Sequence, residues 1–553
     1  ILDHLIISEA SGIVNDENFF SAVSLLNSDV EISNTIIKDT PLPISSQYSR
    51  LKVTSSKLTN VTHVGDYINV NGGKLWLINN IFDGNNIDDM DAIDIGFMED
   101  TTIIQGNTFY DFIGDNTDAI DIGDSSMGVQ IIGNKVVNCG DKAVSIGQGS
   151  EAHIFKNVFA KCNLGVGIKD TGSMAFIDHN TFYLNNVGVA VYQKVINRGG
   201  GSADIRNSIF MNSNEVPVSS DEFSSADVYY SISDTDTLKG SSNLFGDIHL
   251  INPENENYYP QVISPVINAS EDIYLDSEQA ESLSEIGAFQ FQGILDHVLV
   301  INEINYHSSL DFDPEDWIEF YNITESPLDI SKWVFIDGSY EQAYVFKENL
   351  IVPSKEYHDL SRDLSLFTDL FPTVSQVSGN MYKGFSGSGE SLYLYNNDGF
   401  LVDSLTYSDS SPWPEQADGN GPSLELISPF LDNGISESWQ ASPRHGTPGL
   451  DNSQFTSRKL EENSTKYEIE LFQNYPNPFN PSTLINFQIP EHSQISLNVY
   501  DMLGREVAVL MNGPIQAGYH QIPFDAKNLS SGMYIYRLKA GNKVITRKLT
   551  LIK

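Results

Sequence analysis

The sequence predicts an all-β protein, in which a right-handed parallel β-helix is followed by two β-sandwich domains. Two observations support this prediction: a repeat of about 23 residues in the first half, and short strands with period-two alternation in the second half. Long stretches with a 3.6-residue apolar period are missing. The 553 residues are 40% hydrophobic, which is enough to build the cores of about three domains.

The repeat of the first half places an Asn after a short apolar strand and an apolar pair after that Asn. The series consists of Asn34, Asn80, Asn107, Asn134, Asn157, Asn180 and Asn207. Neighbours are 23 or 27 residues apart except at the first gap of 46, where Lys57 occupies the intermediate slot. This period is typical of a parallel β-helix with coils about 4.8 Å apart, so the asparagines should form a ladder that satisfies backbone groups in the turns.

A second series between the asparagines predicts another short strand in each coil. It comprises residues 92–96, 119–123, 143–147, 165–169 and 188–192. We therefore expect two short strands per coil, with turns between them. The pattern fades after residue 215, and we expect the β-helix to occupy residues 1–292. Ile1 leads directly into a strand-like run, so we expect the N-terminus to be the cut end of a longer protein.

The charge of the chain limits its partners. Acidic residues outnumber basic ones by 74 to 31, for a formal net charge of −43. This sign repels nucleic acid and anionic lipid, and it favours cations, Ca²⁺ above all, because Ca²⁺ prefers hard oxygen ligands. The favoured interpretation, however, is that the charge only keeps a secreted protein soluble, with cation binding as the alternative. No apolar run reaches about 18 residues, so no membrane-spanning helix is expected.

Other side chains of the repeat are expected to be structural. Two cysteines exclude a disulfide scaffold, and Cys139 and Cys162 should be stacked neighbours because each lies five residues after a ladder Asn. Buried free thiols are the expected state, and a strained disulfide between coils is the alternative. We expect His153 and His179 on the surface. Core stacking is favoured over a sugar platform for the recurring aromatics Phe109, Phe159, Phe182 and Tyr183.

The second series also predicts an acidic outer face. Because strand side chains alternate, Ile93 should face inward and Asp94 outward, and Asp121 repeats this in the next coil. Carboxylates stacked about 5 Å apart repel one another unless a cation lies between them. The candidate calcium ligands are Asp91, Asp94, Asp118 and Asp121. Later coils should present Ser145, Lys169 and Tyr192 in register, with Lys142, Lys194 and Arg198 nearby.

This constellation resembles that of the parallel β-helix polysaccharide lyases, in which Ca²⁺ binds a uronate carboxylate and a Lys or Arg removes the neighbouring proton. The resemblance implies Asp118 and Asp121 as calcium ligands and Lys169 as the catalytic base, by position. Substrate contacts would come from Ser145, Tyr192 and Lys194. The sequence departs from that family, because the adjacent-aspartate doublet is not where the family has it and no Arg accompanies Lys169.

Two functions are therefore weighed for the β-helix. The favoured hypothesis is a non-catalytic module that binds extracellular polysaccharide or serves as a surface scaffold or adhesin. The alternative is a calcium-dependent uronate lyase. A Lys169 that points into a groove beside Asp94 and Asp121 would favour the lyase, whereas an ion pair with one of them would make Lys169 structural.

From residue 297 onward the alternation and spacing of strands are those of a β-sandwich. The motifs at 301–304 and 317–322, with the late Trp439 and Pro448-Gly449, resemble the lamin-tail domain over residues 295–452. The resemblance implies an immunoglobulin-like fold and an adhesion or spacer role. An acidic loop is expected to be solvated, with a cation site as the alternative; it contains Asp311, Asp313, Glu315 and Asp316.

Residues 453–466 are polar and charged and predict a linker. The final domain, 467–553, has alternating strands, the run Asn-Tyr-Pro-Asn-Pro-Phe-Asn-Pro at 474–481 and the run Val-Tyr-Asp-Met-Leu-Gly-Arg-Glu-Val at 499–507. These motifs resemble the C-terminal sorting domain of the bacterial type IX secretion system, which implies a second immunoglobulin-like sandwich. The resemblance also implies handling by the type IX machinery, export across the outer membrane, and release or attachment at the cell surface.

Overall fold

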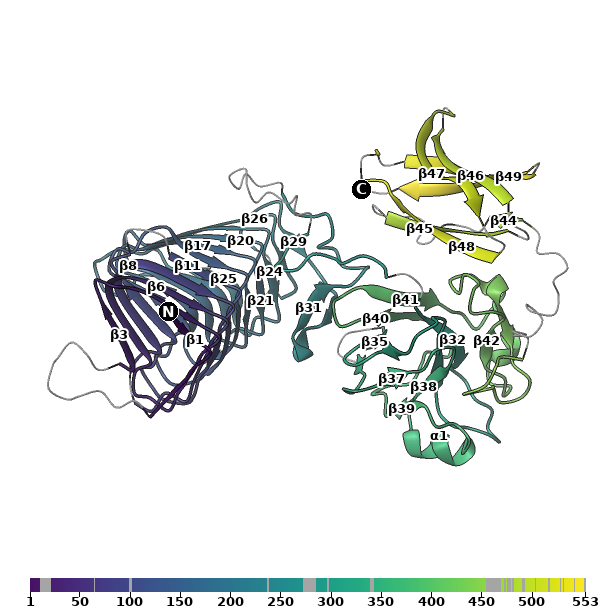
Figure 1. The fold of residues 1–553 in the computed structure, drawn as a ribbon, viewed down its shortest axis with the longest axis horizontal. Helices are drawn as coiled ribbons and strands as arrows, with labels where there is room; N and C mark the ends of the chain where they lie inside the picture. Colours follow the sequence, from purple (N-terminus) through teal and green to yellow (C-terminus); the bar gives the residue numbers. More distant parts are fainter. Residues whose placement is uncertain are drawn as a thin grey trace. The chain divides into compact units, whose positions relative to one another are not determined.

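The computed structural model describes the chain except residues 10–20, 64, 99–101, 236–237, 272–284, 296–297, 339–342, 454–468, 472–473, 475–478, 480–481, 490–492, 503, 516–517, 528, 531, 542 and 552–553. The chain forms two compact units, Ile1–Gln292 and Gly293–Lys553 (Figure 1). Most of the predicted linker lies outside the described residues, as does the proline-rich run of the last domain apart from Asn474 and Phe479. In the described part, no helix is long and apolar enough to cross a membrane.

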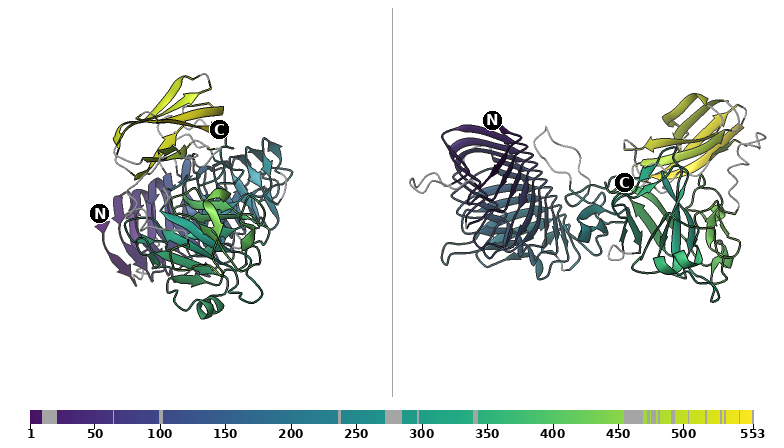
Figure 2. Two further views of the ribbon diagram at one scale, coloured as in Figure 1. Left: turned by 90° about the vertical axis from the view of Figure 1, so that its right-hand side faces the viewer. Right: turned by 60° about the horizontal axis from the view of Figure 1, so that its bottom comes forward.

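The first unit is a parallel β-helix whose central coils contribute three strands each (Figure 2). The coil that contains Asp94 has β10 (Ile93–Gly96), β11 (Thr102–Gln105) and β12 (Thr108–Phe112). Each of these pairs in parallel with its equivalent one coil later. The prediction of two strands per coil was therefore wrong, because the apolar residues after each Asn form a short strand of their own.

The strands occupy three positions in the coil. The first position holds β3 (Val23–Leu26), β10, β13 (Ile120–Ile122), β16 (Lys142–Ile146), β19 (Leu164–Lys169), β22 (Val187–Tyr192) and β25 (Val216–Ser220). The second holds β1 (Leu2–Asp3), β4 (Asp29–Ser33), β11, β14 (Val129–Ile132), β17 (Glu151–Phe155), β20 (Met174–Asp178), β23 (Ser202–Arg206), β26 (Ser225–Tyr229) and β28 (Gly240–Ser241). The third holds β2 (Ile6–Ser8), β5 (Ile36–Lys38), β7 (Lys57–Thr59), β9 (Ile81–Asp83), β12, β15 (Lys135–Cys139), β18 (Val158–Ala160), β21 (Thr181–Tyr183), β24 (Ile209–Met211), β27 (Ile232–Ser233) and β29 (Leu244–Phe245). Two long strands, β6 (Ile44–Thr54) and β8 (Ile68–Ile78), span the first and second positions together.

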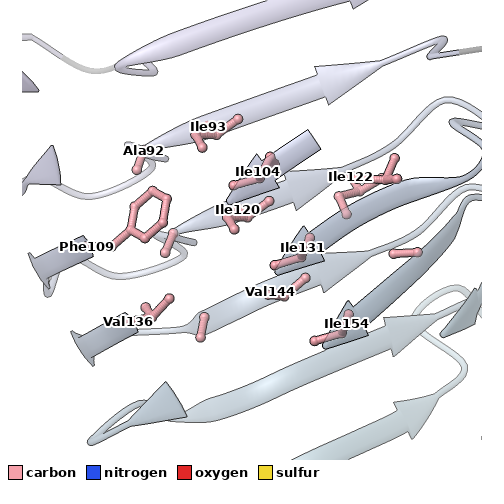
Figure 3. Close-up of a cluster of buried hydrophobic side chains, with 14 of the residues drawn as sticks. Ala92, Ile93, Ile104, Phe109, Ile120, Ile122, Ile131, Val136, Val144 and Ile154 are labelled. Atoms are coloured by element: carbon pink, nitrogen blue, oxygen red, sulfur yellow. The ribbon is translucent and has the colours of Figure 1, made fainter. Parts of the chain in front are cut away.

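Aliphatic ladders fill the interior of the coils (Figure 3). Ile93, Ile120 and Val144 pair in successive first-position strands, and all three are fully buried. Burying one such side chain stabilises the fold by about 1.5–3 kcal/mol. Because a slip of one residue would turn a whole ladder outward, these side chains fix the register, and with it the positions of the outward residues between them.

The predicted asparagine ladder is present from Asn80 to Asn180. The side-chain carbonyls of Asn107, Asn134, Asn157 and Asn180 each accept hydrogen bonds of 2.8–3.0 Å from the backbone N–H and the amide of the Asn one coil earlier. At the ends, Thr35, Ser56 and Ser208 take the slot. The assignment of Asn34, Lys57 and Asn207 to the ladder was therefore wrong by one residue. Asn34 and Asn207 precede the slot with φ of 47° and 43°, a conformation that Asn tolerates well.

The other structural predictions for the repeat have mixed outcomes. Cys139 and Cys162 are free and buried, as expected. The aromatics stack in the core, with ring centroids 4.6 Å apart for Phe82–Phe109 and 4.7 Å for Phe182–Phe210. His153 is exposed, but His179 is buried, so its assignment to the surface was wrong. The left-handed backbone at His179 directs its ring toward Phe155, and its Nδ1 lies 2.8 Å from Asp178 Oδ1.

After the last coil the chain folds back over the third-position sheet. The hairpin of β30 (Leu250–Asn252) and β31 (Asn257–Pro260) follows the coils. Between these strands, Glu254 accepts a 2.7 Å hydrogen bond from the Tyr183 hydroxyl, and Glu256 forms a 2.6 Å ion pair with Lys135. Both partners belong to third-position strands, so this segment covers a face of the β-helix different from the acidic one.

The second unit begins with a sandwich of two sheets. One sheet contains β32 (Leu299–Asn305), β33 (Trp317–Asn322), β38 (Tyr357–Ser361), β39 (Val377–Gly379), β42 (Leu424–Leu426) and β43 (Trp439–Ala441). The other contains β35 (Val334–Asp337), β36 (Tyr344–Val345), β40 (Ser391–Tyr395) and β41 (Leu401–Thr406). Two short strands, β34 (Leu328–Asp329) and β37 (Ile351–Val352), pair with each other, and α1 (Leu364–Leu370) follows β38. Alternating residues of both sheets, such as Phe320 and Phe335, fill one core.

The last domain has its own core between two antiparallel sheets. The smaller sheet contains β44 (Glu470–Leu471), β45 (Ser482–Ile489) and β48 (Gly518–Asp525). The larger contains β46 (Ser493–Asp501), β47 (Glu506–Ile515), β49 (Gly532–Ala540) and β50 (Lys543–Leu551). Leu497 and Tyr536 are fully buried between them, and the Tyr536 hydroxyl accepts a 2.7 Å hydrogen bond from the backbone N–H of Asn474.

Candidate cation-binding face of the β-helix

The acidic face lies on first-position strands, where outward side chains form columns across the coils. The central column aligns Asn69, Asp94, Asp121 and Ser145. The neighbouring column lies three residues earlier in each coil, so that Asp91 and Asp118 stand just before β10 and β13. There Asp91 Oδ1 accepts a 2.7 Å hydrogen bond from the backbone N–H of Asp118, and Asp118 Oδ1 accepts a 3.0 Å bond from that of Lys142.

Three of the four predicted calcium ligands converge. Asp91, Asp118 and Asp121, here called the carboxylate triad, each place an oxygen within 4.8 Å of the other two. Asp94 pairs with Asp121 in the sheet but lies outside this group, and its Oδ2 accepts a 2.9 Å hydrogen bond from Asn69 Nδ2. Oxygen donors at this spacing suit a hard cation such as Ca²⁺.

Burial and mutual repulsion make the charged forms of these carboxylates costly. Burial first, and then the charge of Asp118, raise the pKa of Asp91 to about 9. Burial, Asp66 and Asp121 raise the pKa of Asp94 to about 7. Burial raises the pKa of Asp118 to about 6, although Lys142 acts in the opposite direction. A bound cation would favour the charged forms of these carboxylates and so oppose the rise in their pKa values.

Two lysines approach the triad. Lys142 Nζ lies 3.2 Å from Asp118 Oδ1 and also pairs with Asp141, whereas Lys169 Nζ lies 3.7 Å from Asp121 Oδ1. Burial alone would lower the pKa of Lys142, but Asp118 and Asp141 outweigh it and keep that pKa above its ordinary value. The two lysine side chains are only 5% and 10% exposed, so both ammonium groups are held in ion pairs under cover.

Glycines make room for these lysine side chains. A Cβ on Gly147 would lie 2.7 Å from Lys169 Cε, and a Cβ on Gly167 would lie 2.8 Å from Lys142 Cδ. Each lysine stem thus lies across the adjacent coil, which is how Lys169 reaches Asp121 two coils away.

The predicted column of Ser145, Lys169 and Tyr192 was wrong in register. The sheet pairs Ser145 with Gly167, and Lys169 with Tyr192, because Lys169 lies two residues farther along its strand. Ser145 is fully buried, and within the described structure its hydroxyl has no hydrogen-bond partner. Tyr192 is half-buried beside Lys169, and burial raises the pKa of its hydroxyl.

The two cations predicted near Tyr192 lie in the turn after β22. Lys194 and Arg198 are both exposed there. The backbone N–H of Lys194 donates a 3.0 Å hydrogen bond to Asp170, not to a member of the triad.

Sequence reasoning missed Asp66, whose charge acts on both Asp91 and Asp94. In its coil the Asp-Ala-Ile-Asp pattern of residues 91–94 becomes Asp-Tyr-Ile-Asn at residues 66–69. Aligning the coils on the isoleucine, which the structure pairs as Ile68 with Ile93, would have placed Asp66 beside Asp91.

The acidic loop of the middle domain is only partly solvated. Asp311 and Asp313 are exposed. Glu315 forms a 2.7 Å ion pair with Arg362, and Asp316 Oδ2 accepts a 2.7 Å hydrogen bond from the backbone N–H of Phe385. Burial raises the pKa of Asp316 to about 7. The loop residues are thus used within the domain and do not converge as the triad does.

Comparison with known protein families and proteins identifies the two C-terminal domains. Residues 473–553 match the secretion system C-terminal sorting domain, and residues 296–409 match the lamin tail domain. No curated protein matches the chain. The chain thus carries the sorting domain of type IX cargo, and it is exported by that system to the cell surface or the extracellular space.

Three solved structures show weak likeness. Dimeric latent PorU from Porphyromonas gingivalis is 13% identical over 46% of this chain and 19% of that one, with a TM-score of 0.14. PorZ, a surface component of the type IX secretion system of the same bacterium, is 13% identical over 45% and 30%, with a TM-score of 0.12. The enzymatically active domain of tailspike protein 2 of bacteriophage CBA120 is 11% identical over 96% and 72%, with a TM-score of 0.17. This chain thus spans less than a third of PorU and of PorZ, and scores this low support no argument from likeness.

Proposed function

We propose that this exported protein binds an acidic extracellular polysaccharide through the β-helix, with Ca²⁺ held by the carboxylate triad. The observation behind the proposal is the convergence of Asp91, Asp118 and Asp121 to within 4.8 Å on an outward face. A cation held there would offer its remaining coordination positions to the carboxylates of a uronate polymer. Without such a cation, a chain of net charge −43 would repel that polymer.

The charge balance around the triad supports a cation. Asp66, Asp94 and Asp141 add carboxylates close to it, against the two ammonium groups of Lys142 and Lys169. The carboxylates thus outnumber the nearby cations. A divalent ion would relieve both the mutual repulsion and the cost of burying these charges.

Exposed apolar side chains beside the acidic face support a sugar ligand. Phe97 follows β10, Met127 follows β13, Ile196 follows β22 and Phe223 follows β25. All four lie in the turn at the end of a first-position strand, and each is at least 47% exposed. The apolar faces of sugar rings pack on such side chains. Phe97 and Met127 belong to successive coils, as do Ile196 and Phe223, and the turns of the two coils between these pairs are polar.

A calcium-dependent uronate lyase is the second candidate, because the Lys169 ammonium lies beside the triad. A catalytic base must reach the substrate proton and be free of its own proton. Lys169 is instead paired with Asp121 and is 10% exposed on its side chain. This geometry favours binding over catalysis.

Binding of the full chain to a panel of uronate polysaccharides, in Ca²⁺ and in chelator, tests both candidates. We expect Ca²⁺-dependent binding that is lost in Asp121→Asn. The matched control is Asp115→Asn, which removes the same charge from an exposed position at the start of the same coil. Ultraviolet absorbance from unsaturated uronate, monitored in the same samples, would identify a lyase. Binding that is equally strong in chelator would contradict the calcium site.

A further inference from the structure

The outward side chains of the second-position strands form a face that is separate from the triad. Its central column is in register from coil to coil, because each member pairs with the next in the sheet: Glu31, Lys52, Trp76, Ile103, Gln130, His153, Phe176, Asp204 and Asp227, here called the second-position column. Their strand neighbours, such as Leu75 and Ile154, are buried in the core, so the column faces outward. Coils are about 4.8 Å apart, so the column is roughly 38 Å long.

The middle of this face is apolar. Trp76 pairs with Ile103, and Phe176 follows three coils later in the same column. Ile132 and Phe155 pair with each other in the adjacent column, two residues farther along the strand. All five residues are partly exposed. Soluble proteins rarely leave contiguous apolar surface of this kind without a partner, so this part of the face is a candidate interface.

The N-terminal side of the apolar patch is basic. Arg50 and Lys52 lie on β6 and Lys74 on β8, so the face gathers three cations of a chain that has a net charge of −43. Asp29 and Glu31 of the preceding coil offset two of these charges, and Glu31 forms a 2.6 Å ion pair with Lys52. The region still has an excess of positive charge.

The C-terminal side of the patch is acidic. Asp204 and Asp227 pair in the second-position column, and Asp178 lies one coil before Asp204 in the adjacent column. Arg206 offsets one of these charges through a 2.9 Å ion pair with Asp204, but Glu271 also reaches Arg206 at 3.5 Å. The two ends of the face therefore carry opposite charges, with the apolar patch between them.

A face with this distribution is complementary to itself in one orientation. A two-fold axis parallel to the strands reverses the order of the coils and keeps equivalent columns opposite one another. Lys52 of one copy then lies against Asp227 of the other, and the two apolar patches meet at the centre. If the coils of both copies ran in the same direction, charges of the same sign would face one another, which is unfavourable.

We propose that the protein forms a two-fold symmetric homodimer through this face of the β-helix, with the coils of the two copies in opposite order. Such an interface is isologous, so each copy contributes the same basic end, apolar patch and acidic end. The occupant is a second copy because the opposite ends of one face supply the complementary charges. The triad lies at the first-position strands, outside this face, so the proposal does not depend on the function proposed above.

The test is the oligomeric state of the full-length protein, measured by sedimentation velocity over a range of concentrations. We expect a dimer in the wild type. Lys52→Glu places a carboxylate against Asp227, and Asp227→Lys places an ammonium group against Lys52, so each should weaken the dimer by about tenfold or more in Kd. The double variant reverses both charges and restores their attraction, so it should dimerise as the wild type does.

Lys194→Glu and Asp115→Lys are matched controls, because they reverse the same charges at exposed positions outside this face and should remain dimeric. If either charge reversal on the face prevents folding, Ile103→Gln serves in its place, since Gln130 already occupies the equivalent position in the next coil. A wild type that stays monomeric at its highest soluble concentration would overturn the proposal and leave the face to another partner. A dimer that survives both single reversals and Ile103→Gln would also overturn it, because the interface would then lie elsewhere.

Discussion

Lys169 competes with any cation for Asp121, since its ammonium lies 3.7 Å from that carboxylate. Lys169→Ala should therefore tighten Ca²⁺ binding. Removal of a partly covered ion pair of this kind changes the binding free energy by about 1 kcal/mol, or roughly five- to tenfold in Kd. Isothermal titration with Ca²⁺ measures the change, and Lys194→Ala, which removes an exposed lysine side chain, is the control. Weaker Ca²⁺ binding in Lys169→Ala would rule out this competition.

We expect Asp337 to make the lamin-tail domain sensitive to pH. Burial, and then a hydrogen bond and the charge of Glu390, raise its pKa from 3.8 to about 8. Because the folded state binds the proton more tightly than the unfolded state, the stability from this group is complete below pH 4 and is lost as the pH rises to about 8. The slope is at most about 1.4 kcal/mol per pH unit, and solvent screening reduces it.

Asp337→Asn should flatten this pH dependence, since the amide donates to Glu390 without titrating. Fluorescence melts at pH 5 and pH 9 check the expectation: the wild type should melt at a lower temperature at pH 9, with a smaller difference in the variant. Asp398→Asn, at an exposed turn of the same domain, should behave as the wild type. A wild type that is more stable at pH 9 in this domain would contradict the assignment.

At the scale of the coil, the asparagine ladder is the main polar support of the fold. Asn134→Ala removes the acceptor for two donors of Asn107 and the donor to the Ile104 carbonyl, all of them buried. We expect a loss of about 2–4 kcal/mol in the free energy of unfolding. Denaturation followed by circular dichroism measures it, and Asn163→Ala, at an exposed turn, should cost under about 0.5 kcal/mol. Asn134→Ser should restore part of the loss, since Ser56 and Ser208 occupy the same slot in other coils.

The repeat could be predicted from sequence because stacking imposes the same side chain on successive coils. Ile93, Ile120 and Val144 had to align to fill the interior, and this alignment also placed Asp94 over Asp121. The outward positions carry no such constraint. On β19 the position that pairs with Ser145 and the position two residues later both face outward. Only the pairing of β16 with β19 shows that Lys169 occupies the later position.

The burial of four carboxylates on the six-stranded sheet of the lamin-tail domain was not predictable for a related reason; they are Glu303, Glu319, Asp359 and Glu425. Glu303 and Glu319 are separated from Asp359 and Glu425 by long stretches of chain, and nothing in their local sequence marks them as buried. Alternation alone gives each strand one polar and one apolar face, and a polar face is ordinarily solvated. Burial of this face comes from residues 447–453, which lie over the sheet and bond to it.

At the scale of the whole molecule, the chain has three separate hydrophobic cores. They belong to the β-helix, the lamin-tail domain and the sorting domain, and no buried apolar residue is shared among them in the described structure. Each domain therefore has what it needs to fold as a unit. The candidate binding face and the sorting domain accordingly lie in different domains, and a change in one should leave the other intact.

Removal of the sorting domain tests this independence together with the route of export. A chain that ends at Ser453 keeps the first two cores complete, so it should fold and bind Ca²⁺ as the full chain does. Because the match at residues 473–553 is to the type IX sorting domain, the truncated protein should accumulate in the periplasm instead of at the surface or in the medium. Cell fractionation with detection by antibody measures the distribution, and full-length Asp121→Asn, which alters only the triad, should be exported normally. Surface display of the truncated chain would mean that export depends on a signal outside the last domain.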